Sequence, residues 1–123
     1  MSQHEKINYI ELPAKDLNLA KQFFSQVFAW EFVDYGPEYA AFTQASAGID
    51  GGFYLVDLQC QAAQGSALVV LYSEDLEQTQ AKIEPAGGAV VRPIFSFPGG
   101  RRFHFTDPNG NEYAVWSDQG LSE

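Results

Sequence analysis

Two neighbouring strands near the end of the chain carry most of the side chains that could do chemistry. Residues 101–106 and 112–116 alternate as strands do, and Asp107–Asn111 supplies the Pro, Asn and Gly residues of a tight hairpin loop between them. Opposed residues of a hairpin point to the same side of a sheet. One face therefore carries Arg102, His104, Thr106, Glu112, Ala114 and Trp116, and Arg101 on the other face is expected to be solvated.

A phenol and a second carboxylate share one face of the first strand-like segment, residues 7–12, at Tyr9 and Glu11. In a common site, His104 could act as a general base and Tyr9 as an acid or oxyanion donor. Glu112 or Glu11 could orient the imidazole. Such a set would suit isomerase or lyase chemistry beside a carbonyl group.

The same side chains could instead bind a ligand without transforming it. The Arg102 guanidinium matches a carboxylate or phosphate, and the Trp116 indole could stack on an aromatic ring. Purely structural roles stay open as well. His104 and Tyr9 could form hydrogen bonds that serve the fold, Arg102 could neutralise a carboxylate of the protein, and Trp116 could cap the core.

The strands and helices that must position these residues occur as an internal repeat. Lys15-Asp16-Leu17 opens a helical stretch after an apolar, strand-like run, and Glu74-Asp75-Leu76 does so again 59 positions later. Further strand-like segments follow each helix. One copy could not bury its sheet face alone, so the period predicts two βαβββ modules, residues 7–57 and 66–117. They would pack as one domain, residues 1–123, around a groove.

Helices are expected after Asp16 and Asp75, which are good N-caps, and the first should span residues 17–28. Pro13 is expected to end the first strand, and residues 48–52 and 58–65 are expected to be a loop and a polar connector. The segment 67–72 has the apolar pattern of a strand buried on both faces. The expected strands are 7–12, 30–33, 39–44, 53–56, 67–72, 89–94, 101–106 and 112–116.

Charge and aromatic content narrow the class of ligand. The chain has 16 Asp and Glu against 7 Lys and Arg, a formal net charge of −9, which would repel a nucleic acid and attract a cationic small molecule. Solubility is the simpler explanation of that charge. Ten Phe, six Tyr and two Trp indicate an aromatic core or the lining of a pocket for a flat ligand.

A single cysteine, Cys60, excludes a disulfide framework within the chain and a cysteine-based zinc site. No basic residue lies close to it in sequence, so it is not expected to be a nucleophile. The first residues have no apolar signal-peptide core, and no apolar run approaches the length of a membrane span. We therefore expect a cytoplasmic protein that binds neither membranes nor nucleic acids.

Three segments resemble one known superfamily. They are LPAKDL at residues 12–17, continued by AKQFF at 20–24 and VFAW at 27–30, and DPNGNEY at 107–113. Together with the internal repeat, they are similar to the vicinal oxygen chelate superfamily of glyoxalases, bleomycin-resistance proteins and extradiol dioxygenases. The chain looks most like single-domain bacterial members related to lactoylglutathione lyase. The resemblance implies an α+β fold of two βαβββ modules whose mixed sheet curls around a groove.

The resemblance also implies where a divalent metal would bind, through His, Gln and Glu side chains on inward strand positions. Here the first ligand position falls on Tyr9, that of the second module on Leu68 or Val69, and that of the closing Glu on Ala114. The segment Phe53–Val56 offers no carboxylate or imidazole. Catalytic metal sites need about three protein ligands. No metal site and no cofactor are therefore expected.

We expect a metal-independent protein of this kind that binds a small aromatic or cationic molecule in its groove through Tyr9, Glu11, Arg102, His104 and Trp116. A first alternative is a metal-independent lyase or isomerase with His104, Tyr9 and Glu112 as catalytic residues. Others are a lactoylglutathione-lyase-like metalloenzyme with a shifted ligand set, His104, Glu112 and Glu11, and a purely interacting or regulatory module. The resemblance and the apolar sheet edges favour a homodimer.

Overall fold

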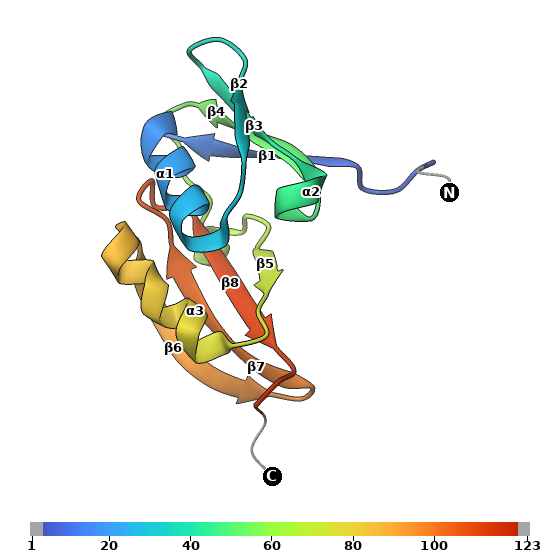
Figure 1. Cartoon of the computed structure of the whole chain (residues 1–123), viewed down its shortest axis with the longest axis vertical. Coiled ribbons are helices and arrows are strands. Elements are labelled where there is room, and N and C mark those ends of the chain that lie inside the picture. Colours follow the sequence, from blue (N-terminus) through green and yellow to red (C-terminus); the bar gives the residue numbers. More distant parts are fainter. Residues whose placement is uncertain (1–3, 121–123) are drawn as a thin grey trace. The chain divides into compact units, whose positions relative to one another are not determined.

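The computed structural model of the chain describes residues 4–120 and divides into two compact units. One ends at Leu58 and the other begins at Gln59 (Figure 1). Each unit is a strand–helix–strand–strand–strand module with its own mixed four-stranded sheet, so the α+β class and the two βαβββ modules are confirmed. Within the described range, no helix is long and apolar enough to cross a membrane.

The first unit has the strand order β1-β4-β3-β2. Strand β1 is parallel to β4, while β4, β3 and β2 are antiparallel neighbours. Its elements are β1 (Tyr9–Ala14), α1 (Leu17–Phe28), β2 (Phe32–Asp34), β3 (Tyr39–Phe42), a one-turn helix α2 (Gln44–Ala47) and β4 (Asp50–Leu55).

Helix α1 begins and ends where the sequence predicts. The Asp16 carboxylate accepts a hydrogen bond from the Leu19 backbone N–H at 3.1 Å, which satisfies one of the free donors of the first turn. At the other end, Ala29 adopts the left-handed conformation and donates its N–H back to the helix. The helix buries one apolar face, formed by Ala20, Phe23, Phe24 and Val27.

An aromatic cluster forms the core between α1 and its sheet. The Phe24 ring stacks on Trp30 with their centroids 4.6 Å apart and lies 5.5 Å from Phe53. Trp30 in turn lies 4.8 Å from Phe42. All four side chains are buried, so much of the aromatic content of the first unit serves packing.

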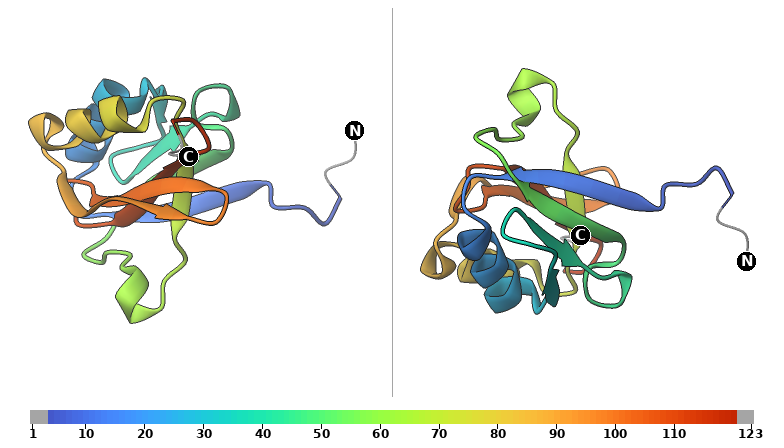
Figure 2. Two further views of the ribbon diagram at one scale, coloured as in Figure 1. Left: turned by 90° about the horizontal axis from the view of Figure 1, so that it is seen from below. Right: turned by 90° about the horizontal axis from the view of Figure 1, so that it is seen from above.

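The second unit has the strand order β5-β8-β7-β6, with β5 parallel to β8 and the other neighbours antiparallel. A 3-10 helix (Ala62–Gln64) precedes its first strand. Its other elements are β5 (Val69–Tyr72), α3 (Leu76–Ile83), a second 3-10 helix (Glu84–Ala86), β6 (Ala89–Phe97), β7 (Gly100–Thr106) and β8 (Glu112–Ser117). Helix α3 covers one side of this sheet, and the first 3-10 helix lies on the other side (Figure 2).

The side of the second sheet that faces α3 holds the core of this unit. Phe103 and Phe105 of β7 and Val115 of β8 are completely buried. Phe105 stacks on Tyr113 with the ring centroids 5.1 Å apart. Helix α3 contributes Leu76 and Ile83 to the buried set, and Asp75 caps it by accepting the Gln78 N–H. The alternation expected for residues 101–106 and 112–116 is therefore confirmed.

Several expected boundaries are wrong, each for a physical reason. Strand β1 runs through Pro13 to Ala14, because β1 is an edge strand and the missing N–H of proline costs no ladder bond on its outer side. Gly51 and Gly52 lie inside β4 and not in a loop. A Cβ at Gly51 would collide with the Ile10 carbonyl, so a close backbone approach explains the glycine.

Strand β5 is not buried on both faces, as its apolar sequence suggests. It forms an edge of the second sheet, and Val70 and Tyr72 are 45% and 48% exposed. Trp30, which was expected to begin a strand, precedes β2 and joins the core. Gln44, which was expected to end a strand, begins a helical turn. Arg101 is not simply solvated either, because it forms an ion pair with Glu77 of α3.

The hairpin between β7 and β8 is built around a buried carboxylate. Asp107 accepts the backbone N–H groups of Asn109 and Asn111 at 2.9 and 3.0 Å, and the Tyr113 hydroxyl donates to it at 2.7 Å. The connector is anchored on the same hairpin. Cys60 donates its N–H to the Asn111 side chain and accepts the N–H of Glu112, both at 2.8 Å. Residues 60–62 therefore belong to the second unit.

Candidate functional site

The side of the second sheet that faces away from α3 gathers the predicted polar residues of this unit. Cross-strand pairing places Arg102 opposite Trp116, His104 opposite Ala114 and Thr106 opposite Glu112. Strand β6 extends the set, and strand β5 adds a tyrosine. We call it the His104 face, and it comprises Tyr72, Arg92, Phe95, Phe97, Arg102, His104, Glu112, Ala114 and Trp116.

Where β7 ends and β8 begins, the Glu112 carboxylate bridges the His104 imidazole and the connector. One oxygen lies 3.1 Å from His104 Nδ1, and the other accepts the Ala62 backbone N–H at 3.1 Å. The His104 side chain is nearly buried, and its Nε2 atom has no hydrogen-bond partner among the described residues. Glu112 thus favours a proton on Nδ1, which leaves Nε2 of the neutral ring as an acceptor.

Two guanidinium groups and two phenylalanine rings share the face with this imidazole, and one of the rings, Phe95, contacts it. Arg92 lies over the Phe95 ring at 3.7 Å from its centroid, and Arg102 lies 5.5 Å from the same ring. The Phe97 ring centroid lies 5.7 Å from the guanidinium carbon of Arg102. The ring centroids of Phe95 and His104 are 5.9 Å apart. The Nε atom of Arg102 is buried and has no partner within residues 4–120. Within residues 4–120, these cations are held by cation–π contacts and form no ion pair.

Trp116 closes one end of the His104 face. Its ring lies 5.2 Å from Tyr72 in an edge-to-face arrangement and 6.5 Å from Phe97. The indole is partly exposed. The Tyr72 hydroxyl donates to Asp118 at 2.6 Å, and this hydrogen bond is the largest cause of a lowered pKa of the Asp118 carboxyl. Trp116 therefore offers a ring to a ligand from a position supported by neighbouring aromatic side chains.

The first unit holds the other predicted residues in a hydrogen-bonded chain of their own. The Tyr39 hydroxyl donates to Glu11 at 3.0 Å and lies 2.6 Å from the Tyr9 hydroxyl. Since the Tyr39 proton is directed to Glu11, Tyr9 is the donor in the second contact. Burial first, and then the bonds to Tyr9 and Glu11, raise the pKa of Tyr39 well above its usual value. Tyr9 itself is 46% exposed and keeps an acceptor oxygen for a further partner.

The predicted site residues therefore form two groups. His104, Glu112, Arg102 and Trp116 share one face of the second unit, as expected. Tyr9 and Glu11 share a face of the first unit, also as expected, with Tyr39 as their partner. That Tyr9 acts together with His104 stays a prediction.

Sequence reasoning missed five residues of these groups: Tyr39, Tyr72, Arg92, Phe95 and Phe97. The strand expected at 89–94 ends too early, because β6 continues to Phe97 through two irregularities in its pairing with β7. Phe95 and Phe97 thus lay beyond the end of the expected strand. The signal that could have found Tyr39 is the alternation of residues 39–42, which places it on the face opposite to the buried Ala40 and Phe42.

The side chains at the expected ligand positions do not fit a divalent metal. Tyr9, Leu68 or Val69, and Ala114 stand there, and the Leu, Val and Ala side chains have no coordinating atom. Residues 4–120 contain no group of three or more His, Cys, Asp or Glu side chains arranged to hold a metal ion. His104 and Glu112 make a pair, and both oxygens of Glu112 already accept hydrogen bonds.

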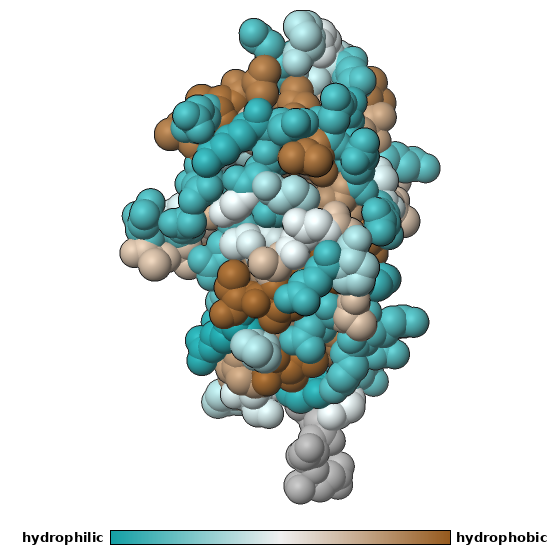
Figure 3. Space-filling view, turned by 90° about the vertical axis from the view of Figure 1, so that its left-hand side faces the viewer, coloured by the Kyte–Doolittle hydropathy of each residue, from teal (hydrophilic) through white to brown (hydrophobic). Residues whose placement is uncertain are grey.

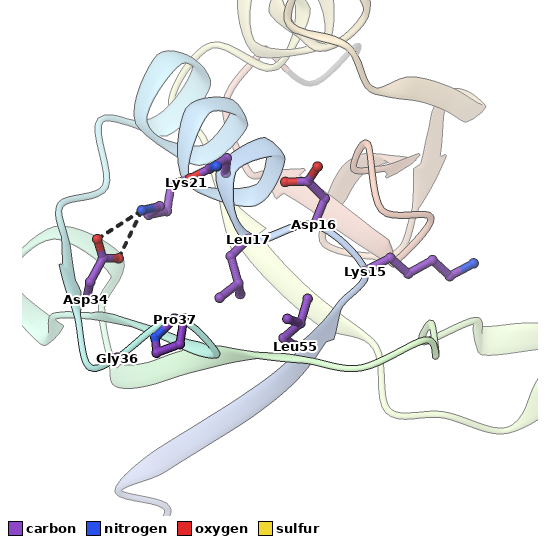
Figure 4. Close-up of a pocket in the computed structure, with 9 residues that line it drawn as sticks. Lys15, Asp16, Leu17, Lys21, Asp34, Gly36, Pro37 and Leu55 are labelled. Atoms are coloured by element: carbon purple, nitrogen blue, oxygen red, sulfur yellow. Dashed lines mark hydrogen bonds and ion pairs between the residues drawn. The ribbon is translucent and has the colours of Figure 1, made fainter.

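A pocket of about 420 Å³ lies in the first unit, beside the start of α1. Figure 4 shows the Lys21 ammonium directed at the Asp34 carboxylate, 2.9 Å away. Asp16, at the same place, caps the helix. Asp16, Lys21 and Asp34, which line this pocket, thus serve the fold of the unit.

The Cys60 thiol does not have the properties of a nucleophile. Burial first, and then the nearby Asp107 charge, raise the pKa of the thiol above its usual value. Its backbone groups, by contrast, hold the connector on the hairpin.

A family model described as Glyoxalase/Bleomycin resistance protein/Dioxygenase superfamily matches residues 6–115. Among proteins of curated description, "Putative glyoxylase CFP32" of Mycobacterium bovis is 24% identical over 115 residues, 89% of this chain and 44% of that protein. The protein of the same name in Mycobacterium tuberculosis matches equally. The chain therefore spans less than half the length of these curated relatives.

Solved structures show the same fold. A glyoxalase-related enzyme from Fulvimarina pelagi has a TM-score of 0.74 at 21% identity, covering 92% of this chain and 88% of that one. The fosfomycin resistance protein FosX from Listeria monocytogenes has a TM-score of 0.74 at 19% identity, with 92% and 93% covered. Lactoylglutathione lyase from Agrobacterium tumefaciens has 0.68 at 19% identity, with 94% and 96% covered. The family match extends over both units, and the chain belongs to the glyoxalase/bleomycin resistance protein/dioxygenase superfamily.

Proposed function

We propose that this protein binds a small aromatic molecule at the His104 face, without the help of a metal ion. The observation that carries the proposal is the nearly buried imidazole of His104, whose Nε2 atom has no partner among the described residues. A buried polar atom left without a hydrogen bond costs about 1–3 kcal/mol. A bound ligand that supplies the missing bond would offset that cost.

The surroundings of His104 support an aromatic guest. Phe95, Phe97 and Trp116 present rings on the same face as the unpartnered nitrogen. Binding sites for small molecules commonly combine apolar rings with a few convergent polar groups. The expected ligand positions at Val69 and Ala114 favour recognition by these groups over coordination to a metal.

The test is a thermal-shift screen with aromatic compounds, followed by matched variants. A ligand present at 100 times its Kd should stabilise the protein by about 2.7 kcal/mol. His104→Gln should abolish the shift of any compound found. His4→Gln is the control, because the His4 side chain is 81% exposed. If His104→Gln responds to the compounds as the wild type does, the proposed site is refuted.

A second candidate is metal-independent acid–base catalysis, and the contact between Glu112 and His104 favours it. A carboxylate that holds Nδ1 prepares Nε2 to take a proton from a substrate. Tyr9 is less suited to be the acid, because its hydroxyl hydrogen is directed to Tyr39. Isomerase and lyase assays on carbonyl compounds would test the candidate. His104→Gln should abolish turnover and Tyr9→Phe should retain most of it, whereas an unchanged His104→Gln rate would rule it out.

We also propose that the protein forms a homodimer through sheet edges. Val33 on β2, Val70 on β5 and Val91 on β6 are each about half exposed on edge strands. In Figure 3 the hydrophobic residues of the face shown form separate patches among hydrophilic ones. Light scattering coupled to size-exclusion chromatography checks the proposal, and a monomer mass at high concentration would contradict it.

A further inference from the structure

We propose that the ligand of the His104 face is an aromatic anion that also carries a hydrogen-bond donor, such as a hydroxylated aromatic carboxylate. This inference rests on the proposed function and names the class of molecule that the site would select. It follows from the local sign of charge, from the donors that Arg92 and Arg102 leave unused, and from the orientation of His104.

The local charge of the face is opposite to that of the whole chain. The chain has a formal net charge of −9. The charged groups that β6, β7 and β8 place on the His104 face are Arg92 and Arg102 against the carboxylate of Glu112. The Asp118 carboxylate, directly after β8, borders the face and accepts the hydroxyl hydrogen of Tyr72. Glu112 is already engaged by His104 and the connector. The charge of the whole protein would favour a cationic guest, but the charge at this face favours an anionic one.

The two guanidinium groups are held close to one ring and have no counter-ion in the part of the chain that the structure describes. Both lie within 5.5 Å of the Phe95 centroid, and within the described residues neither forms an ion pair. Like charges that share a ring repel each other, and an anion placed beside them removes that repulsion. A guanidinium presents donors in a planar fork that suits a carboxylate, and Arg102 has a buried Nε–H with no partner among residues 4–120.

His104 sets the second requirement. Glu112 accepts from Nδ1, so the neutral imidazole presents a lone pair at Nε2. A ligand that only accepts hydrogen bonds would leave this nitrogen unsatisfied. A phenolic hydroxyl or a ring N–H on the ligand would donate to it. The preferred molecule therefore combines an anionic acceptor for the arginines, a flat ring for Phe95 and Trp116, and a donor for His104.

Four probe compounds separate these requirements: 4-hydroxybenzoate, benzoate, benzamide and benzylamine. Each would be titrated into the full-length ¹⁵N-labelled protein, and the Kd would be taken from amide shifts of the His104 face. We expect 4-hydroxybenzoate to bind most tightly, followed by benzoate. Loss of the negative charge in benzamide should weaken binding about tenfold or more, since one hydrogen bond to a charged group is worth about that factor. Benzylamine should bind most weakly.

Neighbouring arginines on opposite faces give a matched pair of variants. Arg102→Gln should weaken the binding of benzoate about tenfold, and it should leave benzamide nearly unchanged. Arg101→Gln is the control, because Arg101 faces α3 and pairs with Glu77. The amide spectrum of each variant reports whether it is folded. If Arg102→Gln does not fold, Arg92→Gln on the exposed edge strand replaces it.

The outcomes separate this inference from the function on which it rests. If benzamide or benzylamine binds the His104 face as tightly as benzoate, or if Arg102→Gln and Arg92→Gln both retain full affinity for benzoate, the anionic class is refuted. Binding of an aromatic molecule to the face would then still stand. If none of the four probes perturbs the face, both proposals are refuted. Tight binding of benzoate that is insensitive to His104→Gln would refute the donor requirement.

Discussion

Replacing Tyr113 by Phe should destabilise the second unit through the carboxylate of Asp107. The two groups are buried in the hairpin between β7 and β8, and the hydroxyl donates to the carboxylate at 2.7 Å. The substitution removes one oxygen atom and leaves the ring that stacks on Phe105. Its effect therefore reports the hydrogen bond and not a change in packing.

The size of this destabilisation follows from the hydrogen bonds that the Asp107 carboxylate retains. One Asp107 oxygen keeps the backbone N–H groups of Asn109 and Asn111. The other keeps a contact of 3.5 Å with the Asn111 side chain, which is too long to replace the lost bond. A hydrogen bond to a charged group contributes about 1.5–3 kcal/mol. We expect the free energy of unfolding to fall by about 2 kcal/mol and the melting midpoint to fall by roughly 6–10 °C.

The assay is urea unfolding followed by tryptophan fluorescence and circular dichroism, and the chain supplies a matched control. Tyr72 also donates its hydroxyl to a carboxylate, that of Asp118, at 2.6 Å, but on an exposed edge strand. Tyr72→Phe should change the unfolding midpoint by much less than Tyr113→Phe, because water replaces the lost bond. Equal effects of the two substitutions would refute the reasoning from burial.

The pH dependence of the loss in unfolding free energy provides a second check. Burial raises the pKa of the Asp107 carboxyl, and the Tyr113 hydroxyl partly opposes this by lowering it. Tyr113→Phe therefore raises the pKa of Asp107 further. A raised folded-state pKa stabilises the protein below the unfolded pKa, near 3.8, and that stabilisation is lost as the pH rises through the folded-state pKa. The cost of Tyr113→Phe should thus be largest at neutral pH and smaller in acid. The opposite trend would contradict this account.

Three further predictions concern the first unit. Gly52→Ala should cost about 1–3 kcal/mol in urea unfolding, because its Cβ would occupy the space of the Tyr39 ring; an unchanged midpoint would contradict this. Glu11→Gln should lower the pKa of Tyr39, seen as an earlier tyrosinate absorbance change in an alkaline titration, since the bond to Glu11 helps to raise that pKa. Phe24→Ala should cost about 3–5 kcal/mol by the same unfolding assay, because the ring is completely buried among other aromatic rings.

The parts of the fold that local chemistry determines could be predicted from the sequence. Helix α1 has both an N-cap at Asp16 and a regular apolar spacing, and its predicted bounds are correct. The hairpin at Asp107–Asn111 was also predicted, because its turn residues leave few alternatives. From that hairpin, alternation alone placed His104, Glu112, Arg102 and Trp116 on one face.

The parts that tertiary contacts determine could not be predicted. Gly51 and Gly52 suggest a loop, yet they lie in a strand because neighbouring backbone and aromatic atoms fill the space of a side chain. The partner of Tyr9 is Tyr39, 30 residues away, and nothing local to either residue signals that contact. The cation–π contact between Arg92 and Phe95 depends on irregularities in β6 that a strict two-residue period does not predict.

The anchoring of the connector decides where the gene could be divided for a split-protein reporter. The backbone of Cys60 and the N–H of Ala62 hold the closing hairpin and the Glu112 carboxylate. A cut between Leu58 and Gln59 would leave these bonds inside the second fragment. A cut at Gly65, which looks equally suitable in the sequence, would remove a backbone hydrogen-bond donor to Glu112 and free His104 to turn. The proteins reassembled from the two alternative pairs of fragments should therefore differ most in how firmly the His104 imidazole is held.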